Sequence, residues 1–188
     1  MAILVIGEFI FGLGDSLLIA AGVGNTPWTV LAEGIADTTE VWTIGEATFL
    51  VSVAVMFLWI PIKETPGIGT ILNIIIIALT IHVMVPILPQ PENPLVSILM
   101  ASLGIVLVGI GSCMYLTANL GPGPRDGWMT GLQRTTGIPI GRVRIAIEAS
   151  VLVIGIVLGG TFGIGTILFA VTIGPVVASC LSIASRID

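Results

Sequence analysis

Gly67-Ile-Gly-Thr-Ile-Leu72 recurs as Gly163-Ile-Gly-Thr-Ile-Leu168, at an offset of 96 residues. When the offset is made one residue longer, the parts of the chain that precede these two stretches also align. The matched pairs there are Gly7 with Gly104, Gly12 with Gly109, Gly14 with Gly111, Gly24 with Gly121, Pro27 with Pro124, and Thr38-Thr39 with Thr135-Thr136. Chance explains one such match in a glycine-rich chain, but not the series. The sequence therefore predicts a tandem duplication, with repeat one in residues 1–90 and repeat two in residues 91–188.

The composition predicts a membrane protein. Of the 188 residues, 55% are hydrophobic and 9% are charged, whereas a soluble domain carries roughly 25% charged residues. Crossing the hydrocarbon core takes about 20 mostly apolar residues per helix. Suitable segments lie at 3–23, 43–62, 69–88, 96–117, 141–159 and 164–184. We therefore expect an all-α membrane protein, with six transmembrane helices in a single membrane domain over residues 1–188.

The positive charges predict the orientation, because cytoplasmic loops retain Lys and Arg. With six spans and both termini in the cytoplasm, every cation falls on the cytoplasmic side: Lys63, Arg125, Arg134, Arg142, Arg144 and Arg186. The opposite side receives Glu33, Asp37, Glu40 and Glu92. Since each repeat holds three spans, the second repeat must be inverted relative to the first. We expect a multi-pass protein of the plasma (inner) membrane.

Each repeat continues from its first span into a Gly- and Pro-rich turn. The turns contain Gly24, Pro27 and Trp28 in one repeat and Gly121, Pro124, Asp126 and Trp128 in the other. The short segments that follow, 27–37 and 124–134, are amphipathic and too short to span. They either re-enter the membrane, which would expose unpaired N–H groups to an anionic ligand, or lie along the interface with the tryptophans as anchors.

Several ionisable residues fall within the predicted spans, where charge is costly. Glu8, Gly12 and Asp15 share one face of the first span, which is a candidate path for a cation or a proton. Alternatively, Glu8 is hydrated near the cytoplasmic surface and Asp15 alone is anomalous. The same two acids, and the lack of a basic segment ahead of them, predict a retained span and not a signal peptide. Arg144 and Glu148 are one turn apart and are predicted to form a structural ion pair.

A stripe of glycines marks the first span of each repeat. Gly7 and Gly14 are seven residues apart, and so are Gly104 and Gly111. Small residues at helical spacing allow close contact between helices in lipid. We therefore predict that the first and fourth spans pack closely at the symmetry axis.

Other classes of site receive no support from the sequence. Cys113 and Cys180 lie inside apolar runs and are interpreted as packing residues. The single histidine, His82, is interpreted as a hydrogen-bonded bystander. We expect no enzyme site, no metal and no cofactor. The net charge of −5 excludes a nucleic-acid-binding surface.

The stretch Ala118-Asn-Leu-Gly121-Pro-Gly-Pro-Arg-Asp126, followed by Gly131-Leu132 and Thr136-Gly137, resembles the YczE-type integral membrane proteins, relatives of the YitT group. The resemblance implies a multi-pass membrane protein and a small-molecule exporter. Arg125 stands where that pattern usually has Trp, whereas Trp28 keeps the tryptophan in the first repeat but lacks the following Asp.

Two functions are compatible with these features. The first is a transporter or exporter of an unidentified small solute, because inverted repeats often hold a site near the bilayer midplane. The second is a non-transporting subunit that scaffolds a membrane complex, and lipid handling is a weaker third alternative. The expected partners are the lipid bilayer, a small solute, and either further copies of the chain or another membrane subunit. The candidate pathway residues are Glu8, Asp15, Gly24, Pro27, Trp28, Gly121, Pro124, Asp126 and Trp128.

Overall fold

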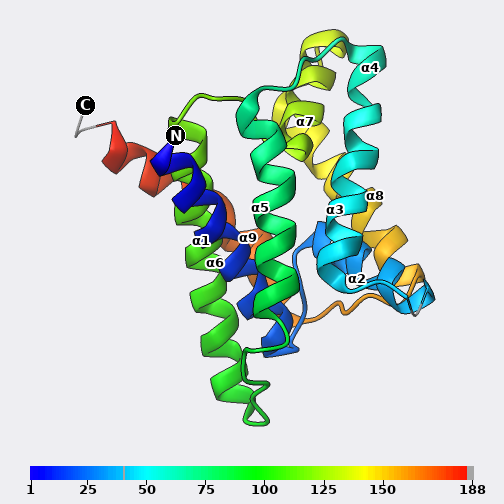
Figure 1. The fold of residues 1–188 in the computed structure, drawn as a ribbon, viewed down its shortest axis with the longest axis vertical. Helices are drawn as coiled ribbons and strands as arrows, with labels where there is room; N and C mark the ends of the chain where they lie inside the picture. The colour runs from blue at the N-terminus through cyan, green and yellow to red at the C-terminus, as the bar shows by residue number, and fades with distance from the viewer. Residues whose placement is uncertain (40, 186–188) are drawn as a thin grey trace.

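A computed structural model describes residues 1–39 and 41–185, and the regular structure in this part of the chain is helical (Figure 1). Glu40 and Arg186, which entered the predicted orientation, lie outside the described residues. The helices are α1 (Ala2–Ala21), α2 (Pro27–Thr39), α3 (Ile44–Phe57), α4 (Trp59–Ile62), α5 (Ile68–Met84), α6 (Pro94–Thr117), α7 (Pro124–Thr136), α8 (Ile140–Val157) and α9 (Ile164–Ala184). All six predicted spans and both short segments are therefore helical.

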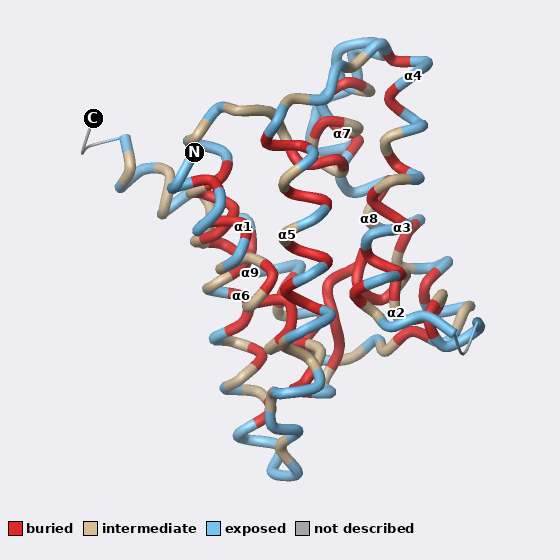
Figure 2. The backbone as a smooth tube through the Cα atoms, in the orientation of Figure 1, coloured by how far each residue is buried: buried red, intermediate tan, exposed pale blue. Residues whose placement is uncertain are grey.

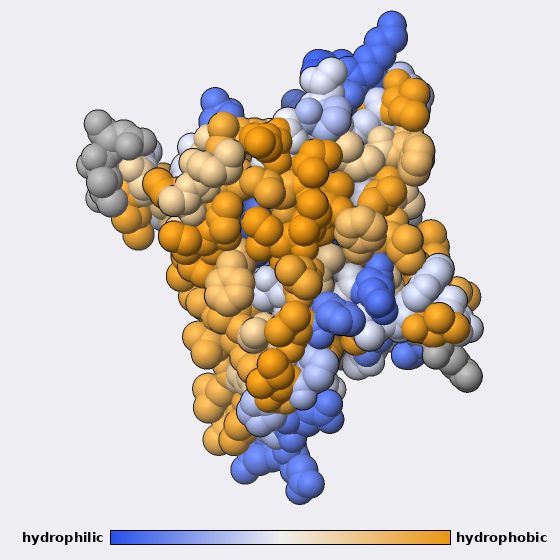
Figure 3. Space-filling view, in the orientation of Figure 1, coloured by the Kyte–Doolittle hydropathy of each residue, from blue (hydrophilic) through white to orange (hydrophobic). Residues whose placement is uncertain are grey.

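Four helical stretches of the described chain are long and apolar enough to cross a membrane. They are Ala2–Ala21, Ile44–Ile62, Pro94–Thr117 and Ile164–Ala184. The other two predicted spans differ for separate reasons: α5 is apolar but has only 17 residues, and α8 carries Arg142, Arg144 and Glu148. Hydrophobic residues cover most of the face shown in Figure 3, and hydrophilic residues gather at its top and bottom and in a smaller group toward the lower right. The molecule is thus an integral membrane protein with several apolar helices.

The glycine stripes bring α1 and α6 into backbone contact. A Cβ added at Gly14 would lie 2.6 Å from the Gly104 carbonyl oxygen, and one added at Gly7 would lie 3.0 Å from the Gly111 carbonyl oxygen. Because the earlier glycine of α1 meets the later glycine of α6, the helices run antiparallel. The predicted close packing of the first and fourth spans is confirmed. Buried residues line the facing sides of α1 and α6 (Figure 2).

Two reciprocal contacts join the halves of the chain. The N–H of Gly69 at the start of α5 donates to the Leu120 carbonyl at 2.8 Å, and the N–H of Gly165 at the start of α9 donates to the Val23 carbonyl at 2.8 Å. Each acceptor precedes a glycine with positive φ, 113° at Gly24 and 119° at Gly121. A side chain would be strained there. The turn after the first helix of each half therefore rests on the last long helix of the other half.

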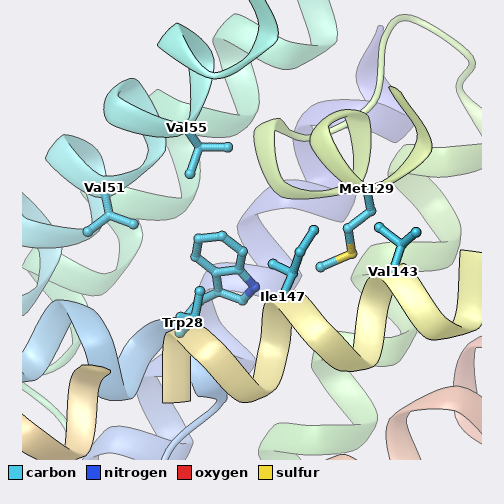
Figure 4. Packing of buried hydrophobic residues seen from close by; sticks show 7 residues of the cluster. Trp28, Val51, Val55, Met129, Val143 and Ile147 are labelled. Atoms are coloured by element: carbon cyan, nitrogen blue, oxygen red, sulfur yellow. The ribbon is translucent and has the colours of Figure 1, made fainter. Parts of the chain in front are cut away.

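A second core forms where α2, α3, α7 and α8 meet. Its buried residues are Trp28, Val51, Val55, Met129, Val143, Ile147 and Val151 (Figure 4). Trp28 is 5% exposed and packs edge-on against Trp128, with ring centroids 6.4 Å apart. Trp28 is therefore a core residue, and its alternative interpretation as an interfacial anchor is wrong. The turn at 22–26 directs α2 back into the protein interior.

Candidate functional site

A cavity of about 110 Å³ lies among residues contributed by both halves of the chain. This space exceeds the roughly 10–15 Å³ that one water molecule needs. Four charged residues line it: Arg125, Asp126, Arg144 and Glu148. The other lining residues include the aromatic side chains of Phe11, Trp28, Tyr115 and Phe169 and the polar side chains of Thr26, Ser52, Asn73 and Ser112. The site thus combines charge with apolar and aromatic walls.

The N-terminal ends of α2 and α7 meet at this cavity. The guanidinium carbon of Arg125 lies 5.0 Å from the centroid of the Trp28 ring, a cation–π arrangement. In α2, the Thr26 hydroxyl accepts from the Thr29 N–H at 3.3 Å. In α7, the N-cap is Gly123, which has no side chain to accept from the first N–H groups. The two helix ends therefore differ, and the end of α7 is the one without a side-chain cap.

Asp15 lies behind this junction and is fully buried, at 0% exposure. The Thr29 hydroxyl donates to its Oδ2 at 2.8 Å, whereas its Oδ1 has no hydrogen-bond partner in the described structure. Asp15 acts electrostatically on Arg125, although the side chains form no ion pair within 4.0 Å among the described residues. The hydrogen bond with Thr29 thereby joins the helix turn that contains Asp15 to α2.

Glu8 is equally buried, at 0% exposure, and neither of its carboxylate oxygens has a hydrogen-bond partner in the described structure. The alternative that Glu8 is hydrated at the surface is therefore wrong. Close packing of α1 against α5 and α6 encloses its side chain. The cavity-lining residue Asn73 is its polar neighbour on α5. Neither Glu8 nor Asp15 lines the cavity itself.

The other charged groups of the cavity have partners. The Tyr115 hydroxyl donates to Asp126. The Nε of Arg144 lies 2.9 Å from Oε1 of Glu148, the pair that the i, i+4 spacing predicts. In contrast, no hydrogen bond or ion pair from the Arg125 side chain is present among the described residues. Arg125 is thus the unsatisfied charge of the cavity lining.

The remaining predicted residues position the site from outside the cavity. Pro27 and Pro124 begin α2 and α7, and the Pro124 carbonyl accepts from the Trp59 indole N–H at 2.9 Å. Gly24 and Gly121 form the two turns described above, and Trp128 supports Trp28. His82 lies elsewhere, with its Nδ1 2.9 Å from the Thr43 hydroxyl.

Sequence reasoning missed Arg125, Tyr115 and Thr29 as parts of one site. A signal for Arg125 was present, because a cation stands where the YczE-type pattern usually has Trp. Thr29 and Tyr115 gave none, since their contacts depend on how the turns at 22–26 and 118–123 fold back.

The chain is 44% identical over 187 residues to an uncharacterized protein of Haemophilus influenzae, a match that covers 100% of this chain and 85% of the relative. It is 34% identical over 173 residues to the uncharacterized membrane protein YczE of Bacillus subtilis, covering 89% of this chain and 79% of that protein. It is also 29% identical over 176 residues to YyaS of Bacillus subtilis, covering 87% and 83%. No solved structure matches significantly. The resemblance to YczE-type proteins is confirmed, and a family model matches residues 1–182, so the chain belongs to the family of unknown function DUF6198.

Proposed function

We propose that this protein is a small transporter or exporter of the plasma (inner) membrane, with its solute site in the cavity between two inverted three-helix repeats. The observation that carries the proposal is the cavity between the two halves of the chain, which is lined by Arg125, Asp126, Arg144 and Glu148. In the proposed six-span arrangement these charges lie among membrane-spanning helices, where charged residues usually mark a path for solutes or ions. The proposal assigns the site to binding and passage, and not to catalysis.

Three features support inverted repeats. The halves share a sequence pattern, α1 and α6 pack antiparallel through matched glycines, and the turns exchange equivalent hydrogen bonds at Gly69 and Gly165. The N-termini of α2 and α7 converge on one cavity, as in transporters whose interrupted helices present their N-termini to a substrate. This geometry favours re-entry of α2 and α7 over an interfacial position.

The two helices that fall short of the span criteria are compatible with six spans. At about 1.5 Å per residue, the 17 residues of α5 extend about 26 Å, close to the roughly 30 Å core that local thinning or flanking residues accommodate. In α8, Arg144 and Glu148 pair with each other and line the cavity. Both termini are then cytoplasmic, as the distribution of positive charge predicts.

Asp15 is the group that we propose couples the transport to protons. A buried carboxylate with an unpartnered oxygen is costly when ionised, so uptake and release of a proton at Asp15 is the coupling step that we propose. Its contact with Thr29 links that proton to the position of α2. Movement of α2 against α7 would then change access to the cavity.

We expect Asp15→Asn to abolish proton-coupled flux while leaving expression and folding intact, because Asn keeps the hydrogen bond with Thr29 but cannot exchange a proton. The measurement is acidification of a lumenal pH dye in liposomes exposed to a panel of small carboxylates, amino acids and amines. Asp37→Asn, at an exposed position of α2, is the matched control and should behave as the unmodified protein.

Unchanged coupled flux in the Asp15→Asn protein would remove Asp15 from the mechanism. If no solute of the panel moves and a stoichiometric partner co-purifies in mild detergent, the protein is instead a non-transporting subunit of a membrane complex.

A further inference from the structure

We propose that the cavity binds the carboxylate group of a small organic anion, with Arg125 as the binding residue and Asp15 as the group that competes for it. This assignment rests on the transport site proposed above. It goes further by naming the chemical class of the solute and the residue that selects it.

One cation of the cavity lining lacks a hydrogen-bond acceptor within the described part of the chain. Asp126 accepts from Tyr115, and Glu148 is paired with Arg144. Arg125 has five N–H donors, and no hydrogen bond from its side chain is present among the described residues. Its guanidinium carbon lies 5.0 Å from the centroid of the Trp28 ring. The Arg125 side chain is only partly exposed, and its unpaired N–H donors can be reached from the cavity that it lines, so a ligand with acceptor oxygens would complete the site.

The shape of these donors favours a carboxylate. The planar guanidinium offers two parallel N–H groups that match the two oxygens of a carboxylate. Stacking on Trp28 fixes the plane of the guanidinium without using its N–H groups. The uncapped N-terminus of α7 adds partial positive charge beside Arg125. The cavity therefore has two sources of positive charge, the Arg125 guanidinium and the N-terminus of α7.

The rest of the lining suits the organic part of the ligand. Phe11, Ile77, Val108, Phe169 and Ile173 present apolar surface to the same space. Pockets for small organic molecules usually combine such walls with a few placed polar groups. A cavity of about 110 Å³ holds only a small molecule. A short aliphatic monocarboxylate meets all three conditions.

Asp15 opposes the ligand when it is ionised. Its carboxylate attracts Arg125 from behind the cavity, so an anion must compete with it. When Asp15 is protonated it no longer attracts Arg125, so the guanidinium is free to bind the anion. Anion binding should therefore strengthen as the pH falls. The groups that face Asp15 and Arg125 are Thr29 of α2, Tyr115 of α6, Asp126 of α7 and Glu148 of α8. Asn73 of α5 and Glu8 of α1 lie along the same interior.

The test measures binding of propionate to the purified full-length protein in detergent, between pH 6 and pH 8. Carboxyl groups titrate near pH 4, so the probe stays ionised throughout. Trp28 lines the cavity, so its fluorescence reports occupancy. We expect propionate to bind more tightly at pH 6 than at pH 8. Propionamide, which is neutral, and propylammonium, which is a cation, should not bind.

Variants assign the two roles. Arg125→Gln should weaken propionate binding at least about tenfold, as expected for the loss of a charge-assisted contact, whereas Arg142→Gln at an exposed position should not. Arg125→Lys keeps the charge and should retain part of the affinity if Arg125→Gln is still folded. Asp15→Asn should bind propionate with an affinity that no longer changes between pH 6 and pH 8. His82→Gln tests the only histidine and should keep the pH dependence.

Binding of propylammonium, or unchanged propionate affinity in folded Arg125→Gln, would overturn the assignment. If propionate binds through Arg125 but no solute crosses the liposome membrane, the transport proposal fails and the anion site stands. If another solute crosses while propionate does not bind, the anion assignment is the part that fails.

Discussion

Glu33 joins segments that are far apart in the sequence through one partly buried set of hydrogen bonds. Its Oε2 accepts from the Asn25 amide at 2.8 Å and from the Thr161 N–H at 2.7 Å, and its Oε1 accepts from the Thr161 hydroxyl at 2.9 Å. These contacts attach α2 to the loop that precedes α9. The Asn25 N–H also donates to the Thr161 carbonyl at 3.2 Å. The start of α2 is therefore held by groups from the other half of the chain.

We expect Glu33→Gln to lower the free energy of unfolding by about 1–3 kcal/mol, because one oxygen that accepts hydrogen bonds is replaced by a donor. The measurement is unfolding in mixed micelles of increasing SDS content, followed by tryptophan fluorescence. Glu92→Gln, at an exposed position, is the control. Equal stability of both variants would show that the Glu33 contacts contribute little.

Individual residues were predictable where the interaction is local. The pair of Arg144 with Glu148 lies within one helix, and spacing alone places these side chains together. Asp15 and Glu8 stood out because carboxylates are rare in an apolar run, but sequence gives no means to identify Thr29 as the partner of Asp15. Arg125 was counted among the cytoplasmic loop charges, whereas it lines the cavity and faces Trp28.

At the level of helices, the contact of α1 with α6 depends on the absence of side chains. Gly14→Val should separate the two backbones, because the Cβ alone would lie 2.6 Å from the Gly104 carbonyl oxygen. We therefore expect the Gly14→Val protein to have a clearly lower melting temperature than the unmodified protein, measured by thermal unfolding in detergent. Lost dispersion contacts between the helices are the physical reason.

Gly141→Val is the matched control, since a Cβ at this position in α8 meets no atom within 4 Å. Its melting temperature should stay within a few degrees of that of the unmodified protein. A similar loss in both variants would indicate that valine itself, and not the contact of α1 with α6, causes the effect.

Element positions followed from the apolar runs and the Gly- and Pro-rich turns, and every predicted helical segment exists. These patterns did not predict that α2 and α7 pack against the other helices of the protein. Both are amphipathic, and an amphipathic segment suits an interface as well as a protein interior. The direction of each helix is set by the turn that precedes it, in which Gly24 or Gly121 adopts a positive φ. It also depends on the segment that each turn contacts, at Gly163 for the first turn and at Gly67 for the second.

For the whole molecule, the proposed orientation is testable with single cysteines. In a background with Cys113 and Cys180 replaced by alanine, we expect Glu92→Cys to react with a membrane-impermeant maleimide in intact cells. Lys63→Cys should react only after permeabilisation, because the proposal places the two positions on opposite sides. Both positions are exposed in the structure. Labelling of both in intact cells would contradict six spans with cytoplasmic termini.

The contact between α1 and α6 also constrains the order of biosynthesis. Gly14 and Gly104 are 90 residues apart in the chain, so α1 leaves the ribosome long before the helix that it packs against. During that interval its glycine face, with Glu8 and Asp15 nearby, has no α6 to cover it. A ribosome stalled before α6 would leave an N-terminal half that the cell's quality-control proteases can recognise, and release of the full chain would remove that signal.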